Sequence, residues 1–387
     1  MRILALITIL FYNTLIYSQM AVLDTTWEAA LQMARESGKP IFVDAYTQWC
    51  GPCKWMAAHT FTREDVGGFY NQHFINVKMD MEHGEGLLFA RAYDVSRYPT
   101  FLFIDAEGEM LHRGLGRMSA QQFLELGAAA LDSTRQLGTL ERAYEAGNRS
   151  SQTMRAYASA LHQAGCGSPA TIALEYLEQQ EDWATSENLQ LIAELAPPDI
   201  HHPMFQFLAQ NRRLAYQQVD PALVDQTLKA GIGVQISREG ISAEDEVTAA
   251  FREVWPAQGR QYAIEYQLKQ LRQSKEEEDR QRYIALGLEL DENYSIENSS
   301  QLQAMAWTFT VFSKEQSHLL QARKWAEQAL KIDDSCASHT LMAAICLRLK
   351  EKGYGIHCAE RAIELGKKEG VDIRMPEGLL RDLQGLE

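Results

Sequence analysis

The sequence predicts two kinds of structure in one chain: an α/β domain built on a mixed sheet, and after it an all-α helical-repeat region. Three observations carry this prediction. Between residues 25 and 132, short apolar runs typical of strands alternate with helical patterns. Beyond about residue 135 the strand signals vanish, and helical stretches are separated by short breaks rich in glycine and proline. Near the C-terminal end, a pattern of alanines and leucines recurs at a fixed interval.

Length and charge narrow the possible functions. The chain has 387 residues, of which 46% are hydrophobic, so we expect more than one folded core. Its 37 basic and 52 acidic residues give a net charge of −15, which repels phosphate backbones. We therefore expect no nucleic-acid partner.

The N-terminal segment is typical of an export signal. Met1-Arg2 is followed by an apolar run from Ile3 to Tyr17 and by the small or polar pair Ser18-Gln19. The run is shorter than the roughly 20 residues that span a bilayer, which disfavours the alternative of a membrane anchor. No cysteine follows it that could carry a lipid. The sequence predicts cleavage near Ser18 and export, to the periplasm.

The first half of the α/β domain is predicted as helix, strand, helix. Residues 25–37 begin with a hydroxyl cap, repeat apolar side chains at helical spacing and end at Gly38-Lys39-Pro40. The apolar run 41–45 follows that proline and is typical of a strand buried on both faces. A helix over 50–60 is expected next.

The second half contributes the remaining strands and their covering helices. Residues 62–70 and 87–93 are predicted to be helical, and 74–79 alternate as a strand that ends at Asp80. Residues 100–104 and 110–113 flank a turn and predict a hairpin. Ser119 is placed to cap a last helix over 120–131, which completes a mixed sheet with helices on both faces.

Two cysteines at a strand-to-helix junction are the strongest chemical signal. Cys50-Gly51-Pro52-Cys53 follows the apolar strand, so Cys50 lies at a helix N-terminus, where free N–H groups and the helix dipole favour a thiolate. Cys53 lies one turn on and can close a disulfide with it. We predict that Cys50 is the exposed nucleophile. A zinc site would need a second pair of ligands at matching spacing, and the chain has no other C-x-x-C.

The other four cysteines are widely spaced, and we interpret them as buried, small apolar residues, with an accessory disulfide as the alternative. They are Cys166, Cys336, Cys346 and Cys358. No metal, haem or nucleotide motif occurs in the sequence, so no cofactor is expected.

The segment from Val43 to Lys54 resembles the active-site segment of the thioredoxin family, and the resemblance extends over residues 25–132. Arg97-Tyr98-Pro99-Thr100 resembles that family's cis-proline loop, and Gly116 resembles the glycine before its last helix. Further similarity to the secreted, disulfide-reducing branch comes from Trp27, Gly38-Lys39-Pro40, Thr60-Phe61 and Phe74-Ile75-Asn76-Val77.

The resemblance assigns roles to individual residues. Asp44 is an acid inside an apolar strand, where burying its charge costs free energy and tends to raise its pKa. By resemblance, it matches the family's proton-transfer residue, which serves the second cysteine. The alternative is a tolerated strand acid. Lys78 departs from the family's lysine pattern, which leaves a partnership with Asp44 in doubt. The resemblance implies substrate binding by Trp49, Tyr98, Pro99 and Thr100. The alternative for Pro99 is an ordinary trans turn proline.

The helical region shows one clear internal repeat. The pattern at Ala326, Glu327 and Ala329 recurs at Ala359, Glu360 and Ala362, an offset of 359 − 326 = 33 residues. A pair of antiparallel helices with this period resembles the tetratricopeptide class, whose period is about 34. The alternative is unrelated helical hairpins that share an alanine-rich seam. We therefore divide the chain into a signal peptide (1–18), a thioredoxin-like domain (19–134), a helical region of uncertain repeat type (135–240) and tetratricopeptide-like repeats (241–387).

These patterns predict an exported thiol-disulfide oxidoreductase, a reductase or isomerase of protein disulfides that acts through Cys50 and Cys53 with Asp44. Gly51-Pro52 resembles the spacer of reducing thioredoxins. Its expected partners are protein disulfides or dithiols, an unidentified electron donor and a protein bound to the helical repeats. The rival hypothesis is a helical-repeat binding protein whose redox domain is an accessory.

Overall fold

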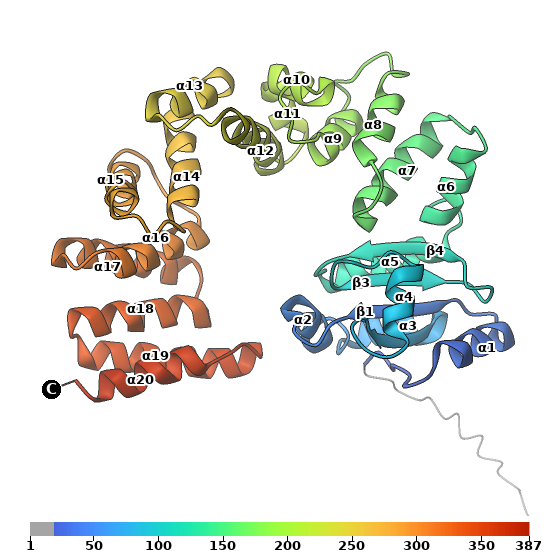
Figure 1. Cartoon of the computed structure of the whole chain (residues 1–387), viewed down its shortest axis with the longest axis horizontal. Helices are drawn as coiled ribbons and strands as arrows, with labels where there is room; N and C mark the ends of the chain where they lie inside the picture. Colours follow the sequence, from blue (N-terminus) through green and yellow to red (C-terminus); the bar gives the residue numbers. More distant parts are fainter. Residues whose placement is uncertain (1–18, 387) are drawn as a thin grey trace, which may run out of the picture. The chain divides into compact units, whose positions relative to one another are not determined.

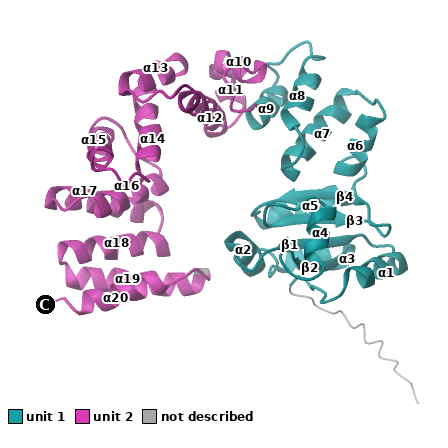
Figure 2. Ribbon diagram, viewed as in Figure 1, with its two compact units in different colours: residues 1–195 teal, residues 196–387 magenta. Residues whose placement is uncertain are grey.

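A computed structural model describes residues 19–386, so the predicted signal peptide at 1–18 lies outside the described part. The chain divides into two compact units, Met1–Leu195 and Ala196–Glu387 (Figure 2). The first unit contains all the strands of the described residues, and the second consists of helices. The predicted order, an α/β domain followed by an all-α region, is confirmed. Among the described residues, no helix has the length and apolar character needed to span a bilayer.

Within its described residues, the α/β domain contains five helices and four strands (Figure 1). They are α1 (Trp27–Ser37), β1 (Ile41–Tyr46), α2 (Gly51–His59), α3 (Glu64–His73), β2 (Ile75–Asp80), α4 (Gly86–Ala92), β3 (Thr100–Ile104), β4 (Met110–Leu115) and α5 (Ala120–Leu131). The cap of α5 is the predicted one: Ser119 and Gln122 form a capping box that satisfies the free N–H groups at its start.

The sheet is mixed, in the order β2-β1-β3-β4. β1 pairs with β2 in parallel, and both β1–β3 and β3–β4 pairs are antiparallel. β1 is therefore a central strand, and the active-site segment continues from its C-terminal end. The chain just before α1 also joins the sheet, because Leu23 forms a parallel bridge with Val77 of β2.

Alternation along β1 divides the domain into two apolar layers. Ile41, Val43 and Ala45 pack with residues of α1 and α4 in one cluster. Phe42 points to the other face, where it packs with Met56 of α2 and with the phenylalanines of β3 and α5. Asp44 shares the face of Phe42, because the two residues are two positions apart in the strand.

Four further helices of the first unit continue from the sheet: α6 (Leu137–Glu145), α7 (Ser151–Ala164), α8 (Pro169–Leu177) and α9 (Ser186–Leu195). Both α6 and α7 pack against the edge strand β4. The Leu137 N–H at the start of α6 donates to Nδ1 of the buried His112 in β4, at 3.1 Å. Burial, reinforced by the charge of Arg135, lowers the pKa of His112 to about 4, so the ring accepts this bond in its neutral form. The helical region thus begins as a cover for the sheet edge.

Residues 196–386, the described part of the second unit, contain eleven helices. They are α10 (Pro203–Gln210), α11 (Arg212–Gln218), α12 (Pro221–Glu239), α13 (Glu244–Val254), α14 (Gly259–Leu271), α15 (Glu277–Asn293), α16 (Ser299–Phe312), α17 (Gln316–Ile332), α18 (Cys336–Leu349), α19 (Lys352–Glu369) and α20 (Arg374–Gln384). Helices α16 to α19 form two consecutive pairs, and the repeat occupies the second helix of each pair. Ala326 and Ala329 of α17, like Ala359 and Ala362 of α19, are fully buried. Alanine recurs there because only a small side chain lets neighbouring helices approach closely.

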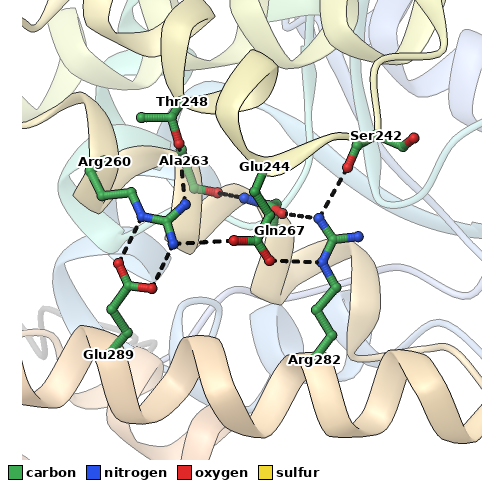
Figure 3. A network of polar contacts seen from close by, with 8 residues as sticks. All are labelled: Ser242, Glu244, Thr248, Arg260, Ala263, Gln267, Arg282 and Glu289. Carbon is green, nitrogen blue, oxygen red and sulfur yellow. Dashed lines mark hydrogen bonds and ion pairs between the residues drawn. The ribbon is translucent and has the colours of Figure 1, made fainter.

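Charged side chains bridge α13, α14 and α15 (Figure 3). Arg260 of α14 binds Glu289 of α15 through Nε at 2.7 Å and Nη2 at 2.5 Å, and its Nη2 also lies 3.3 Å from Glu244 at the start of α13. Arg282 of α15 donates to the other Glu244 oxygen at 3.1 Å. The network ties three helices together, because Glu244 of α13 is shared by Arg260 and Arg282, and Arg260 also binds Glu289.

Candidate active site

The predicted cysteine pair forms a disulfide at the junction of β1 and α2. The Cα atoms of Cys50 and Cys53 are 5.3 Å apart. Cys50 is the N-cap of α2, and its sulfur accepts a hydrogen bond from the Cys53 N–H at 3.1 Å. Pro52 lies in the first turn of α2, where a proline has no hydrogen bond to lose. Because the helix begins here, negative charge on the Cys50 sulfur is stabilised by a directed N–H group and by the helix dipole.

Solvent exposure does not separate the two sulfurs in this oxidised state. Cys50 is 2% exposed and Cys53 is 4% exposed. The prediction that Cys50 is the exposed nucleophile concerns the reduced pair and stays a prediction; in the disulfide, only its N-cap position distinguishes Cys50 from Cys53. The neighbouring Trp49 is 66% exposed and is the most accessible aromatic side chain at the site.

Asp44 is a buried acid without a hydrogen-bonding partner. It is 2% exposed, and neither carboxylate oxygen has a partner among the described residues. It faces the layer that contains α2, the helix that carries Cys53. Burial raises its pKa to about 7, although the charge of Lys78 opposes the shift. Asp44 can therefore take up or release a proton near neutral pH.

Lys78 is near Asp44 without binding it. The two residues are register partners in the parallel strands β1 and β2. The Lys78 ammonium lies 4.3 Å from the centre of the Tyr46 ring, a cation–π contact, and it makes no hydrogen bond to the Asp44 oxygens. Lys78 therefore lowers the pKa of Asp44 through the field of its charge, while the carboxylate stays unpaired.

The loop before β3 has the predicted cis peptide bond, between Tyr98 and Pro99. Gly116 supports it: its N–H donates to the Pro99 carbonyl at 2.9 Å, and its φ of +88° is one that glycine adopts without strain. Thr100 is fully buried, and its hydroxyl donates to the Arg97 carbonyl at 2.7 Å. Thr100 thus stabilises the loop by a buried hydrogen bond, whereas the half-buried Tyr98 is partly accessible to solvent.

Trp49 is held over the site by two contacts. Its indole N–H lies 3.0 Å from both carboxylate oxygens of Glu82, in the segment after β2. Its ring meets that of Tyr98 edge to face, with centroids 5.9 Å apart. Asp80, the last residue of β2, accepts hydrogen bonds from Gln48 at 3.0 Å and from His83 at 2.9 Å. The structure thus brings Trp49 and Tyr98 together, and it adds Glu82, which the sequence analysis missed because a surface glutamate after a strand has no distinguishing pattern.

The cis-proline loop also contacts the helices of the first unit. The Arg97 guanidinium donates to the Gly165 carbonyl at the end of α7. Gly165 packs so closely there that an added Cβ would lie 2.5 Å from Leu115 and 2.9 Å from Arg97. The residue next to Tyr98 is therefore fastened to the helical part of its own unit.

The remaining four cysteines lie outside the active-site disulfide. Cys336, Cys346 and Cys358 are buried, as predicted, and Cys166 is half-buried in the turn after α7. Burial raises the pKa of Cys346 to about 12, with a smaller contribution from neighbouring Cys358, so this thiol is not reactive at neutral pH. Within residues 19–386, no group of three or more His, Cys, Asp or Glu side chains is arranged to hold a metal ion.

Comparison with known proteins agrees with this geometry. The family described as thioredoxin-like matches residues 21–106. A thioredoxin-like protein of a Synechocystis strain is 34% identical over 94 residues, which are 24% of this chain and 84% of that protein. The thiol:disulfide interchange protein DsbD of Yersinia pestis is 30% identical over 96 residues, or 24% of this chain and only 16% of DsbD.

Among solved structures, a candidate disulphide-isomerase from Bacteroides thetaiotaomicron is 38% identical and has a TM-score of 0.29. The match covers 30% of this chain and 96% of that one. These matches cover between 24% and 30% of this chain. What is said of the long helical region therefore comes from its own sequence and structure.

Proposed function

The chain belongs to the thioredoxin-like family, and from this premise we propose that it is an exported enzyme that reduces or isomerises disulfides in protein substrates. Its α/β domain is a thiol-disulfide oxidoreductase domain with a C-x-x-C pair. The proposal concerns the reaction, the roles of the residues and the location of the protein.

The proposed reaction starts from the reduced pair. The Cys50 thiolate attacks one sulfur of a substrate disulfide, which forms a mixed disulfide and releases the other substrate sulfur as a thiolate that takes up a proton. Asp44 accepts the proton of the Cys53 thiol, and the Cys53 thiolate attacks the Cys50 sulfur. The second substrate sulfur leaves and is protonated. Two electrons pass to the substrate, and the enzyme is left with the Cys50–Cys53 disulfide, which an electron donor must reduce again.

The observation that carries this proposal is the unpaired carboxylate of Asp44 on the face covered by α2. A buried acid without a partner destabilises the fold, so its presence behind the helix that carries Cys53 calls for a chemical reason. Its pKa of about 7 suits proton transfer at neutral pH. The name of DsbD, thiol:disulfide interchange protein, also describes thiol-disulfide exchange, which supports protein partners of this kind.

Substrate binding is proposed for the two aromatic residues at the rim. Trp49 directly precedes Cys50, and Tyr98 of the loop before β3 meets its ring edge to face. The Glu82 carboxylate accepts a hydrogen bond from the indole and fixes its orientation. Pro99, which is buried, and Thr100 set the shape of the loop. An extended substrate segment can then lie against the backbone of this loop, next to Cys50.

Trapping of mixed disulfides tests the reaction. In Cys53→Ala the resolving thiol is absent, so Cys50 should stay covalently linked to its substrates, which mass spectrometry after non-reducing separation identifies. The matched control is Cys50→Ala with Cys53→Ala, which should trap nothing. Equal trapping through Cys53 in a Cys50→Ala variant would overturn the assignment of the nucleophile.

Export is proposed from the N-terminal sequence. Arg2 and the apolar run 3–17 lie before the first described residue, Gln19. A mature protein that begins near Gln19, measured by intact mass after expression in a host that exports it, is the expected result. Recovery of the chain with Met1 intact would refute export.

Partner binding by the helical repeats is the second candidate function, and one observation favours it. A half-open cavity of about 810 Å³ lies between α16, α18 and the start of α20. Trp307, Val311 and Met375 line it and are 36%, 59% and 54% exposed, which is unusual for apolar side chains of this size. If binding is the main function, the variant without both cysteines should still capture its partners non-covalently. Deleting the whole protein from its host should then leave the reduction of other proteins' disulfides unchanged.

A further inference from the structure

The second unit contains a groove that differs in chemistry from the redox site and from the cavity at α16. We propose that this groove, between α10, α12 and α13, binds an amphipathic helical segment of a protein partner that carries lysine or arginine residues about two turns apart. This inference does not depend on the proposed redox function, because every residue that carries it lies between 200 and 254.

One face of each helix contributes to the groove, and the cavity between them measures about 730 Å³. Helix α12 contributes Ile232, Gln235, Ile236 and Glu239, which follow the i, i+3, i+4, i+7 spacing of a single helical face. Helix α13 contributes residues 246, 249, 250, 253 and 254 with the same spacing. The groove is therefore a continuous surface between helices, wide enough for side chains of another element to enter.

The floor of the groove is apolar. Phe205 of α10 and Ile232 and Ile236 of α12 form its base, and they are nearly completely buried against the core of the unit. Ala249 and Ala250 keep the wall formed by α13 low, because alanine adds only a methyl group above the backbone. A row of apolar side chains from a partner helix can be buried on such a floor, with a gain of about 25 cal/mol per Å².

The rim of the groove is acidic. Glu239, Glu246 and Glu253 line it, and none of the residues that line the groove is a lysine or an arginine. Glu239 accepts a hydrogen bond from Gln235, but neither Glu246 nor Glu253 forms an ion pair with another described residue. This differs from Glu244 in the same helix, which is shared by two arginines (Figure 3). The two rim carboxylates are thus available to a cationic partner.

The spacing of the rim charges indicates a helical occupant. Glu246 and Glu253 are seven residues apart on one face of α13, which corresponds to about 10.5 Å along the helix. Lysines or arginines at positions i and i+7 of a docked helix have the same separation, while its i+3 and i+4 side chains face the floor. A second copy of this chain is a poor match, because each copy has a net charge of −15.

The test uses the full chain and a fluorescein-labelled helical peptide of leucine and lysine, with leucines on one face and lysines seven residues apart. Binding is measured by fluorescence anisotropy at about 0.15 M salt. Glu246→Gln with Glu253→Gln should raise Kd about tenfold, because two charge pairs are lost. Asp245→Asn with Glu278→Gln is the matched control: it removes the same charge from exposed helical positions outside the groove, and Kd should change less than about twofold.

A third variant tests whether the groove itself is occupied and what occupies it. Ala249→Lys places a long cationic side chain in the groove from an exposed position, so the chain should fold and lose peptide binding; circular dichroism reports the folding. Disulfide reduction by the α/β domain should be equal in all variants. The proposal is overturned if the groove variants bind as well as the wild type, or if the control pair weakens binding equally, since attraction would then be diffuse. It is also overturned if the wild type dimerises in sedimentation and Ala249→Lys abolishes the dimer, since the occupant would then be a second copy.

Discussion

Asp44 of the first unit is buried and unpaired, whereas the half-buried Asp225 of the second unit is hydrogen-bonded. In the α/β domain, Asp44 is 2% exposed and both of its oxygens lack a partner. In the helical unit, Asp225 accepts hydrogen bonds from Tyr216, Trp255 and Tyr262. A paired acid of this kind joins helices, whereas an unpaired one stores a destabilising free energy. Asp225 thus joins helices of the second unit, while the missing partner of Asp44 supports its proposed role in proton transfer.

Asp44→Asn should give the largest effect, and its sign depends on pH. The pKa is about 7 in the folded protein and 3.8 in the reference state, so protonation stabilises the fold fully below pH 3.8, and this stabilisation is lost as pH rises through 7. The wild type therefore carries a penalty of up to about 4 kcal/mol at pH 8.5 that an asparagine does not. Hydrogen exchange of the β1 amides should show the variant to be more protected at pH 8.5 and nearly unchanged at pH 4.

The same variant should be a poorer enzyme. Without a proton acceptor for the Cys53 thiol, resolution of the mixed disulfide should slow more than its formation, and rapid-mixing kinetics on a model disulfide separates the two steps. A gain in protection that is equal at both pH values, or turnover that is unchanged, would place Asp44 with the structural acids of the helical unit.

Arg260→Met tests the opposite case, with an intermediate effect. The guanidinium joins Glu289 and Glu244, so its removal leaves both carboxylates without that partner (Figure 3). Since Glu289 is 34% and Glu244 39% exposed, water screens the loss, and we expect destabilisation of about 1 to 2 kcal/mol rather than the full cost of a buried charge.

Urea unfolding of the full chain, monitored by hydrogen exchange of the α14 amides, measures this loss of stability. Adding Glu289→Met to Arg260→Met should restore part of the stability, because the unpaired carboxylate is then absent as well. If Arg260→Met instead stabilises the unit, the network costs free energy, as Asp44 does, and the contrast between the two units disappears.

Local signals explain what the sequence could predict. Helix α5 has the predicted bounds, 120–131, because Ser119 is a strong N-cap and the apolar spacing is unbroken. Strand β3 and the Tyr98–Pro99 loop were also foreseen, since a proline before an apolar run is informative by itself. Lys78, whose role was in doubt, lies opposite Asp44 in register and acts only through its charge.

Contacts between distant segments explain what the sequence could not predict. The bond from Leu137 to His112 joins α6 to the sheet edge, and it places the expected domain boundary near residue 134 inside the first compact unit. The boundary was predicted from the point where strand patterns stop, and such a prediction cannot include this contact. Its partners, Leu137 and His112, are 25 residues apart, and neither lies in a distinctive sequence pattern. Glu82 and the acidic groove were missed for the same reason. The division of the chain, and the tetratricopeptide character of its last part, remain predictions.

Arg97→Ala should give the smallest effect, and it asks whether the helices of the first unit influence the redox site. Arg97 precedes Tyr98, and its guanidinium is fastened to the Gly165 carbonyl at the end of α7. Loss of this exposed hydrogen bond should loosen the loop without moving the cysteines. We therefore expect KM for a protein disulfide to rise about threefold while kcat, and the rate on a small generic disulfide, stay the same.

Arg97→Lys keeps the charge and a hydrogen-bond donor, so it should restore part of the affinity. Arg91→Ala, which removes an exposed arginine of α4, is the matched control. A change in kcat on the small disulfide would mean that the loop positions the cysteines themselves, whereas unchanged KM would confine the helices to covering the sheet edge.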